Sequence, residues 1–397
     1  MRVLLSTFGS RGEVQPTLAV GVELLALGAQ VRMCAPPDFR ALVEGYGVEF
    51  VPVGSELSGV GRKKGMATEA DRRASIDGMI DTHFATLGPA AEGCEVLLGC
   101  GALQIAAQSI AELRGMRYIY AAFAANTLPS EQIPPPPLGP GVDAEADVRA
   151  QWEQDAVRWN LLWRDSLNKH REALGLAAVD QVRDYIFTDH PWLAADPLLS
   201  PWPDSKLDVW QPGAWLLRDT RPLAPELEEF LTACDPPVYF GFGSMHVGAD
   251  TAHNALAAAR TLGYRAIVLR GWAGLDLDEA GPDCLVVGEV NHRALFPRTA
   301  AVVHHGGAGT TAAVAASGTP QVVVPQMFDQ YYWAAQVERL GVGVAHAPGQ
   351  PSAESLTAAL SRALTPQIRS AARTLGPRIR IDGAARAAHQ VLATERV

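Results

Sequence analysis

The chain has 397 residues, of which 48% are hydrophobic and 19% are charged, and its formal net charge is −10. This composition is ordinary for a globular protein and argues against disorder, while the length predicts two domains that each bury a core. The negative charge argues against nucleic acid and anionic membranes as partners, because both bind clustered Lys and Arg. A phosphorylated small molecule is still compatible with it, since such a ligand needs only local hydrogen-bond donors.

Cysteine usage and the N-terminus bear on the cellular compartment. The five cysteines contain no C-x-x-C pair and cannot all pair within the chain, so we expect buried thiols in a reducing compartment. The apolar run after Met1 and Arg2 is too short for a signal peptide, and no run approaches the roughly 18 apolar residues of a spanning helix. The sequence therefore predicts a cytoplasmic protein.

The first half alternates short apolar segments with longer helical ones. "RVLLST" (2–7) predicts a strand, "VQPTLAVGVELLALG" (14–28) predicts a helix that ends at Gly28, and "QVRMCAP" (30–36) predicts a second strand. Further strands are expected at "CEVLLG" and "RYIYAAF". Such alternation is typical of a parallel sheet covered by helices. The turn after the first strand, "FGSRGE", has G-x-x-G spacing and not the G-x-G-x-x-G of dinucleotide folds, and Pro16 is expected to start a new segment.

The middle of the chain differs from both halves. "EQIPPPPLGPG" (131–141) predicts an extended surface loop, since consecutive prolines fit neither a helix nor a central strand. Seven of the nine tryptophans follow this loop. They either pack the domain edges and linker or line a pocket for a flat aromatic ligand, and both interpretations stay open. These residues are Trp152, Trp159, Trp163, Trp192, Trp202, Trp210 and Trp215.

The second half repeats the pattern of the first. "PPVYFGFGSMHVG" (236–248) predicts a strand followed by a Gly-Ser turn, much like "VLLSTFGSRG". Later strands are expected at "RAIVLRG", "CLVVGEV", "AAVVHHGG" and "PQVVVPQ". Two sheets of one type, each with a Gly-Ser loop at the carboxyl end of a strand, suggest a ligand held between them.

The segment 301–334 is the most informative. An apolar strand leads to His304 and His305, then to a glycine-rich loop with a helix start at Thr310, and Gly318 ends that helix. Small residues at a helix N-terminus allow backbone N–H groups to approach an anion, which the helix dipole also favours. No Lys follows the glycines, so this is not a Walker P-loop. Taken alone, the loop could also be an ordinary strand-to-helix turn.

Two further features favour a sugar phosphate at this loop. His305 can donate a hydrogen bond to a phosphate, and Asp329 with Gln330 follows the next strand at the same sheet edge. An acid beside an amide suits two sugar hydroxyls, because the acid accepts and the amide both donates and accepts. The alternative interpretation of this pair is a helix N-terminal cap.

Together these motifs resemble a known family. "HHGGAGTT" with "PQMFDQYYWA" resembles the donor-binding signature of GT-B glycosyltransferases that use nucleotide-activated sugars. "MRVLLSTFGSRGEVQP", "RMCAPPDF", "LPSEQIPPPPLG", "TDHPWLAADP" and "GEVNHRALF" look like the bacterial glycosyltransferases of vancomycin- and teicoplanin-type glycopeptide biosynthesis. The matching stretches run over nearly the whole chain.

The resemblance implies an α/β protein with the GT-B fold, in which two Rossmann-like domains with parallel sheets face an interdomain cleft. It implies an acceptor-binding domain (1–200), a linker (201–218), a nucleotide-sugar-binding domain (219–377) and a C-terminal helix (378–397) that crosses back to the first domain. A monomer is expected. The donor-binding residues implied are Ser10, Arg11, Gly12, Ser244, Trp272, Val290, His305, Gly306, Gly307, Ala308, Gly309, Thr310, Asp329 and Gln330.

The resemblance also points to a catalytic base. Three residues before the helix proline, matching antibiotic enzymes carry Asp and many relatives carry His, whereas this chain has Glu13. A carboxylate is too weak a base to ionise a free phenol, but it can accept the proton while the C–O bond forms. One base without a second carboxylate nucleophile favours direct displacement with inversion. The alternative is that Glu13 is only a first-turn acid favoured by the helix dipole.

The expected reaction needs neither a cofactor nor a metal, with a UDP- or dTDP-sugar as co-substrate. "DLD" (276–278) could be read as a D-x-D metal motif, but its acidic surroundings favour a solvated loop. We expect a hexose of glucose or N-acetylglucosamine type to be moved to a hydroxyl of a glycopeptide aglycone. The alternatives are an aminodeoxysugar such as a vancosamine, or another aromatic or polyketide acceptor.

Other protein classes fit less well. An NAD-dependent oxidoreductase would need the G-x-G-x-x-G turn and an acidic ribose ligand about 20 residues further on, and a serine hydrolase would need a G-x-S-x-G elbow. Neither pattern occurs in the chain. A protein that binds sugar nucleotides without catalysis stays open, and it would differ from an enzyme in failing to glycosylate an aglycone.

Overall fold

The computed structural model describes residues 1–57, 68–137, 145–203, 206–243, 250–271 and 281–393. The chain divides into two compact units. Unit 1 comprises Met1–Ala195, Pro201–Leu217 and Asp382–Val397, and unit 2 comprises Asp196–Ser200 and Arg218–Ile381. Most of the segment predicted to be a linker, 201–217, therefore groups with unit 1.

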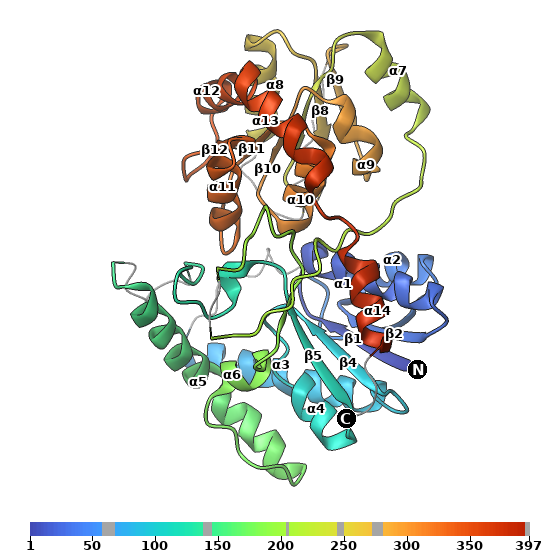
Figure 1. Ribbon diagram of the computed structural model, residues 1–397, viewed down its shortest axis with the longest axis vertical. Helices are drawn as coiled ribbons and strands as arrows, with labels where there is room; N and C mark the ends of the chain where they lie inside the picture. Colours follow the sequence, from blue (N-terminus) through green and yellow to red (C-terminus); the bar gives the residue numbers. More distant parts are fainter. Residues whose placement is uncertain (58–67, 138–144, 204–205, 244–249, 272–280, 394–397) are drawn as a thin grey trace. The chain divides into compact units, whose positions relative to one another are not determined.

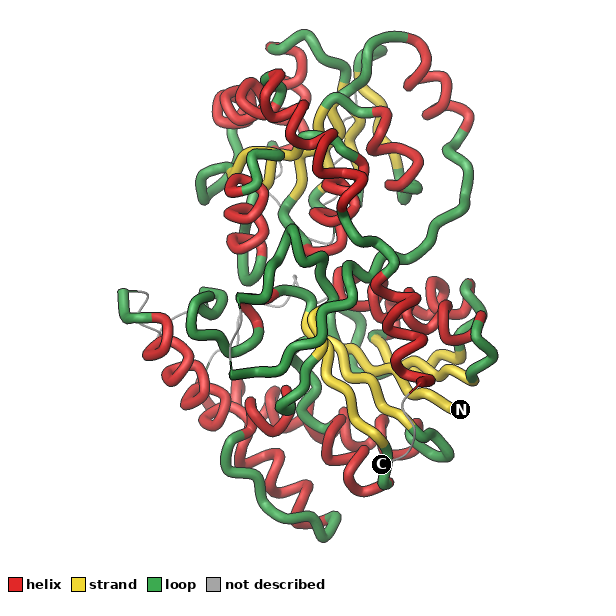
Figure 2. The backbone as a smooth tube through the Cα atoms, in the orientation of Figure 1, coloured by secondary structure: helices red, strands yellow, loops and turns green. Residues whose placement is uncertain are grey.

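Unit 1 contains a parallel sheet of six strands within the described residues, in the order β3-β2-β1-β4-β5-β6 (Figures 1 and 2). The first strand thus lies between the second and the fourth, and the connections on its two sides run in opposite directions. All backbone pairs in this sheet are parallel. The strands are β1 (Arg2–Thr7), β2 (Gln30–Ala35), β3 (Glu49–Pro52), β4 (Val96–Cys100), β5 (Arg117–Ala122) and β6 (Trp192–Leu193).

Helices cover the sheet of unit 1, so that β1 is buried on both faces at Val3, Leu4 and Leu5. The C-terminal helix α14 packs beside α1, as Figure 1 also shows. The helices are α1 (Arg11–Ala26), α2 (Arg40–Gly45), α3 (Glu69–Ala90), α4 (Ala107–Arg114), α5 (Val148–Ala173), α6 (Val182–Phe187) and α14 (Gly383–Ala393).

Unit 2 repeats this topology. Its six described strands are parallel in the order β12-β11-β10-β7-β8-β9, so its first strand also lies between its second and its fourth. The strands are β7 (Val238–Gly241), β8 (Ala266–Leu269), β9 (Cys284–Val287), β10 (Ala301–His304), β11 (Gln321–Val323) and β12 (Gly343–Ala345). The helices are α7 (Pro225–Ala233), α8 (Thr251–Thr261), α9 (His292–Leu295), α10 (Ala308–Ser317), α11 (Gln330–Arg339), α12 (Ala353–Ala363) and α13 (Pro366–Leu375).

The predicted fold class, two Rossmann-like parallel sheets, is confirmed, but three short strands were missed. β3, β6 and β12 have only two to four residues each. The predicted strands β7 to β11 also have only three or four residues each, so length alone does not explain the difference. They pair at the outer positions of each sheet, where β2, β5 and β11 supply the backbone partners.

The start of α1 corrects one prediction. The helix starts at Arg11, three residues before the predicted start at Val14, and Pro16 lies inside it instead of starting a new segment. Ser10 is the N-cap residue, and its hydroxyl accepts a hydrogen bond from the Gly12 N–H at 3.3 Å. Pro16 lacks the N–H that would bond to the Gly12 carbonyl, and a site this close to the helix start tolerates the loss better than a helix centre would.

The proline-rich loop is irregular as predicted over 131–137, but it is not wholly on the surface. Pro135 and Pro136 are buried, while residues 138–141 lie outside the described residues. Several tryptophans support the packing interpretation. The ring centroids of Trp192 and Trp210 lie 4.5 Å apart, and those of Trp192 and Trp215 lie 6.4 Å apart, both edge to face.

None of the helices in the described part of the chain combines the length and apolarity that a membrane crossing requires.

The start of α14 packs closely against the segment 201–217 of the same unit. A Cβ atom on Gly383 would overlap the Gly213 carbonyl group and lie 2.9 Å from the Ala214 oxygen. We expect Gly383→Ala to destabilise the protein by about 1–3 kcal/mol, since the clash is with backbone. Gly78→Ala is the control: Gly78 is exposed inside α3 with open space around it, so the substitution should add about 0.5–1 kcal/mol of stability. Urea unfolding would measure both, and an equal effect of the two would contradict the tight contact.

Candidate active site

The loop after β1 packs on helix α3 through a pair of stacked rings. The Phe8 ring lies on the His83 ring of α3, with centroids 3.5 Å apart and an angle of 13° between the planes. His83 is buried, and this burial lowers the pKa of its imidazole to about 3. The ring is therefore neutral at physiological pH, and Phe8 leads directly into the turn that carries Ser10, Arg11 and Glu13.

Glu13 lies in the first turn of α1 and is half-buried. Thr17, one turn further along, donates its hydroxyl hydrogen to the Glu13 carbonyl oxygen at 2.7 Å. The position is a topological switch point, since β1 and β4 are neighbours whose connections diverge. Ligands of doubly wound folds bind where such connections separate, outside the carboxyl ends of the strands. The structure thus places the predicted base where a substrate of unit 1 would be expected.

The equivalent switch point of unit 2 lies between β7 and β10, and His305 occupies it. A Cβ atom on Gly243, just after β7, would lie 3.1 Å from His305 Cε1, and one on Gly307 would lie 2.7 Å from Nε2. Small residues therefore surround this ring. Burial lowers the pKa of His305 to about 4, and within the described residues its buried Nδ1 has no hydrogen-bond partner. A neutral imidazole keeps one N–H donor that can serve a phosphate.

His304 shapes the glycine loop, which the sequence analysis did not foresee. The Gly306 N–H donates to His304 Nδ1 at 3.1 Å, and His304 Nε2 lies 2.9 Å from the Gln321 side-chain oxygen. Because Nδ1 accepts, the proton of the neutral ring is on Nε2 and donates to Gln321. Complete burial lowers the pKa of His304 to about 3. The adjacent histidines were visible in the sequence, but the partner Gln321 became apparent only from the pairing of β10 with β11.

The loop then runs into α10 at Ala308, with Gly307 as the N-cap residue, two residues earlier than predicted. The first bond of the helix joins the Thr311 N–H to the Gly307 carbonyl at 2.9 Å. The N–H groups of Ala308, Gly309 and Thr310 precede this bond and so have no partner within the helix. Gly318 ends α10 as predicted, with φ of 71° in the left-handed region.

Asp329 and Gln330 lie beside this loop. A Cβ atom on Gly306 would be 3.2 Å from the Gln330 carbonyl oxygen, so the two segments touch. The Gln330 side-chain oxygen accepts hydrogen bonds from the N–H groups of Gln326 (2.7 Å) and Met327 (3.2 Å) and so shapes the turn before α11. That oxygen is therefore already engaged by backbone, which the sequence analysis did not anticipate.

Asp329 occupies the N-cap position of α11, but its side chain makes no capping hydrogen bond, so the capping interpretation is not supported. Its Oδ2 accepts a hydrogen bond from the Trp333 indole at 3.0 Å. Burial raises the pKa of Asp329 to about 6. The carboxylate is thus ionised at neutral pH and protonated in mild acid.

The other predicted site residues are distributed as follows. Val290 is partly buried against the core of unit 2. Ser244, Trp272 and the Asp276–Asp278 motif lie outside the described residues. Among the residues that are described, no cluster of three or more His, Cys, Asp or Glu side chains is arranged to hold a metal ion.

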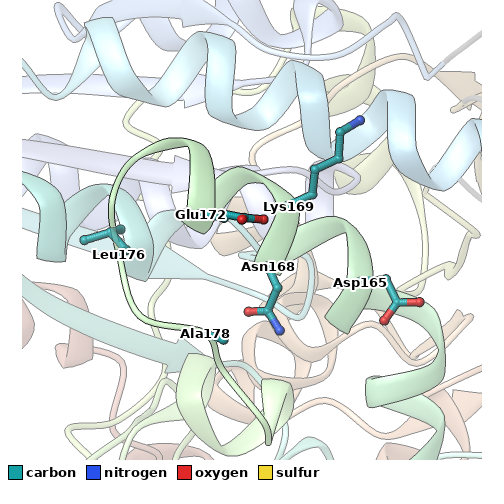
Figure 3. Close-up of a pocket in the computed structure, with 6 residues that line it drawn as sticks. All are labelled: Asp165, Asn168, Lys169, Glu172, Leu176 and Ala178. Atoms are coloured by element: carbon teal, nitrogen blue, oxygen red, sulfur yellow. The ribbon is translucent and has the colours of Figure 1, made fainter.

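A surface hollow of about 550 Å³ on α5 lies in unit 1 (Figure 3). The Asn168 side chain in it is bonded in both directions to the backbone of Val179, at 2.8 and 2.9 Å. None of the predicted site residues lines the hollow. The lining residues are Asp165, Asn168, Lys169, Glu172, Leu176 and Ala178.

Comparisons with known proteins identify the family to which the chain belongs. The family model "Glycosyltransferase family 28 N-terminal domain" matches residues 3–94, and "Erythromycin biosynthesis protein CIII-like, C-terminal domain" matches residues 267–393. The vancomycin aglycone glucosyltransferase of Amycolatopsis orientalis is 47% identical over 99% of this chain and 97% of its own length. The dTDP-epi-vancosaminyltransferase of the same organism is 42% identical over 94% of this chain and 93% of its own length. Among solved structures, the glycosyltransferase of kitacinnamycin has a TM-score of 0.74 at 19% identity, covering 98% of both chains.

The two Rossmann-like sheets of identical topology have the GT-B fold, and the full-length relatives show that the chain is a glycosyltransferase, an enzyme that takes its sugar from a nucleotide-sugar co-substrate. Within that class, the chain belongs to the glycopeptide-antibiotic (vancomycin- and teicoplanin-type) family of glycosyltransferases. The resemblance predicted from the sequence motifs is thereby confirmed.

The hydrogen bonds of His304 predict a clear mutational result. His304→Phe keeps a flat aromatic ring, slightly larger than imidazole, but leaves the buried Gly306 N–H and Gln321 oxygen unpaired, at a cost of about 1–3 kcal/mol for each group. We expect lower stability and a donor KM raised by at least about tenfold. His304→Asn should recover most of the donor affinity, because its amide oxygen takes the place of Nδ1. Donor KM and thermal unfolding would measure both variants, and equal donor KM for Phe and wild type would contradict this function of His304.

Proposed function

We propose that this enzyme transfers a hexose of glucose or N-acetylglucosamine type from a UDP- or dTDP-sugar to a hydroxyl of a vancomycin-type glycopeptide aglycone, with inversion at the anomeric carbon. The observation that carries the choice of substrates is the 47% identity, over nearly the full length of both chains, to a vancomycin aglycone glucosyltransferase. The geometry of the glycine loop of unit 2 supports a diphosphate donor, and unit 1 carries the base and is proposed to bind the acceptor.

The donor diphosphate is proposed to bind at the N-terminus of α10. The N–H groups of Ala308, Gly309 and Thr310 and the positive end of the helix dipole stabilise negative charge there, and His305 donates one further hydrogen bond. This charge grows as the bond to the sugar breaks, so fixed donors stabilise the transition state more than the ground state. Ser10, Arg11, Gly12 and Ser244 are proposed to donate hydrogen bonds to the same phosphates. The nucleotide base is proposed to pack near Trp272 and the backbone around Val290.

The acceptor oxygen attacks the anomeric carbon on the face opposite the diphosphate. The new C–O bond forms while the bond to the diphosphate breaks, and the electron pair of that bond leaves with the phosphate. The proton of the acceptor hydroxyl passes to Glu13, and the configuration of the sugar inverts. A carboxylate suits this because the hydroxyl becomes far more acidic as its oxygen bonds to carbon.

The alternative is transfer of an aminodeoxysugar, which the 42% identity to a dTDP-epi-vancosaminyltransferase favours. Mass spectrometry would distinguish the two when the enzyme is incubated with vancomycin aglycone and a panel of UDP- and dTDP-sugars. A glucosylated product supports the main proposal, a vancosaminylated product alone supports the alternative, and no product with any sugar would contradict both.

Each reaction would be repeated with EDTA, since we propose that no metal takes part. If EDTA abolishes activity and Mg²⁺ or Mn²⁺ restores it, the proposal of a reaction without a metal is contradicted.

Glu13→Gln tests the base. The amide keeps size and polarity but cannot take up the proton, so kcat should fall by about 10²–10⁴-fold while donor binding is retained. Rates are compared with saturating donor across pH 6–9, where His304 and His305 stay neutral because burial lowers their pKa to about 3 and about 4. Glu13→Asp should be much milder. A Gln variant within a few-fold of wild type would leave Glu13 as a helix-start residue only.

Asp329 is proposed to bind the hexose hydroxyls as an ionised acceptor. Because burial raises its pKa to about 6, the ionised form is lost as the pH falls through 6, and the KM for the sugar nucleotide should then rise. Asp329→Asn should have a high KM that no longer changes between pH 5 and 7. Calorimetric titration with the free nucleoside diphosphate is the control, since this ligand has no sugar. Equal losses of affinity for both ligands would show that Asp329 does not contact the hexose.

A further inference from the structure

The carboxylate of Glu13 lies against two glycines at the ends of neighbouring strands. A Cβ atom built on Gly9, just after β1, would overlap Glu13 Oε2, and one built on Gly101, just after β4, would overlap Glu13 Oε1. One carboxylate oxygen therefore fills the space of each missing side chain. Gly9 and Gly101 are called the glycine pair below.

The backbone alone does not account for both glycines. Gly101 has φ of 85°, a left-handed conformation that disfavours any residue with a Cβ atom. Gly9 has no such φ, so its conformation would accept other residues. What Gly9 does meet is the Glu13 carboxylate, with the second oxygen 2.8 Å from the position of a Cβ atom.

The strand order explains why these two residues meet one side chain. Gly9 and Gly101 are 92 positions apart, but β1 and β4 pair in register up to Thr7 and Cys100. The next residues of both strands therefore emerge side by side at the switch point. Gly101 is held there by a backbone hydrogen bond from its N–H to the Ala121 carbonyl at 2.9 Å.

We propose that the glycine pair positions the catalytic carboxylate by admitting it between the ends of β1 and β4. Glu13 has one methylene more than the Asp expected in matching antibiotic enzymes, and the space above the two glycines accommodates this extra length. Gly9 and Gly101 are thus positioning residues that act through Glu13. The inference rests on the proposed function of Glu13 as the base.

Gly101→Ala tests the inference, with Gly28→Ala as a matched control. Gly28 also lies in unit 1 and has φ of 83°, but a Cβ atom there would meet nothing within 4 Å. Both substitutions therefore strain the backbone alike, and only one displaces Glu13. We expect both variants to lose similar thermal stability, while Gly101→Ala alone loses kcat, by about 10²-fold as for a misplacement of roughly 1 Å. Donor KM should stay within about twofold of wild type.

Rescue by a shorter base separates positioning from a general structural effect. Glu13→Asp removes one methylene, so its carboxyl carbon takes the place of Glu13 Cγ, 3.7 Å from the Cβ position of Gly101. We therefore expect that adding Gly101→Ala to Glu13→Asp changes kcat by less than about threefold. The rates are measured with saturating donor and vancomycin aglycone across pH 6–9. If Gly101→Ala does not fold, Gly9→Ala takes its place, because its backbone accepts Ala without strain and the same rescue is expected.

The outcomes distinguish the two proposals. If Glu13→Gln loses activity but Gly101→Ala and Gly9→Ala have the same kcat as Gly28→Ala, the result supports Glu13 as the base. It then overturns the proposal that the glycine pair positions Glu13. A loss in Gly101→Ala that Glu13→Asp does not relieve also overturns the positioning function. If Glu13→Gln keeps its activity, the base is wrong and the inference that rests on it is overturned as well.

Discussion

In both units the first strand of a parallel sheet lies beside the fourth, and the rest of the site depends on this strand order. The connections that leave two such neighbouring strands run to opposite faces of the sheet. This leaves a space outside the carboxyl ends of the two strands. In unit 1 Glu13 lies at this position, and in unit 2 His305 lies there. Both side chains belong to segments that begin at these strand ends.

Small residues make room at both edges, in different ways. In unit 1 the carboxylate of Glu13 lies over Gly9 and Gly101, and in unit 2 the imidazole of His305 lies against Gly243 and Gly307. A side chain at these positions would displace the functional group. The glycines of such loops therefore make room for a neighbouring side chain as well as for a ligand. A substitution at such a glycine displaces that neighbouring side chain, although the neighbour itself is not mutated.

Burial also sets the protonation states that the chemistry uses. Desolvation lowers the pKa of His304 and His305, so that neither carries a charge of its own toward the donor. In the proposed donor site, the diphosphate charge is therefore offset by backbone N–H groups and the dipole of α10, which are fixed in place and do not titrate. Burial also raises the pKa of Asp329 to about 6. The hydrogen-bonding capacity of Asp329 therefore changes near pH 6, whereas both histidines stay neutral at that pH.

The sequence alone determined the features that local patterns encode: alternating strands and helices, the glycine loop before α10, its end at Gly318, and the family. It did not determine the start of α1, where Ser10 caps the helix and Pro16 lies inside it. Only the tertiary structure decided that Gln321 holds His304, that the Gln330 oxygen serves the backbone, and that Gly101 meets Glu13. Each of these contacts joins side chains or backbone whose distance is fixed by strand pairing or turn geometry, and residue patterns along one segment carry no record of which strands become neighbours.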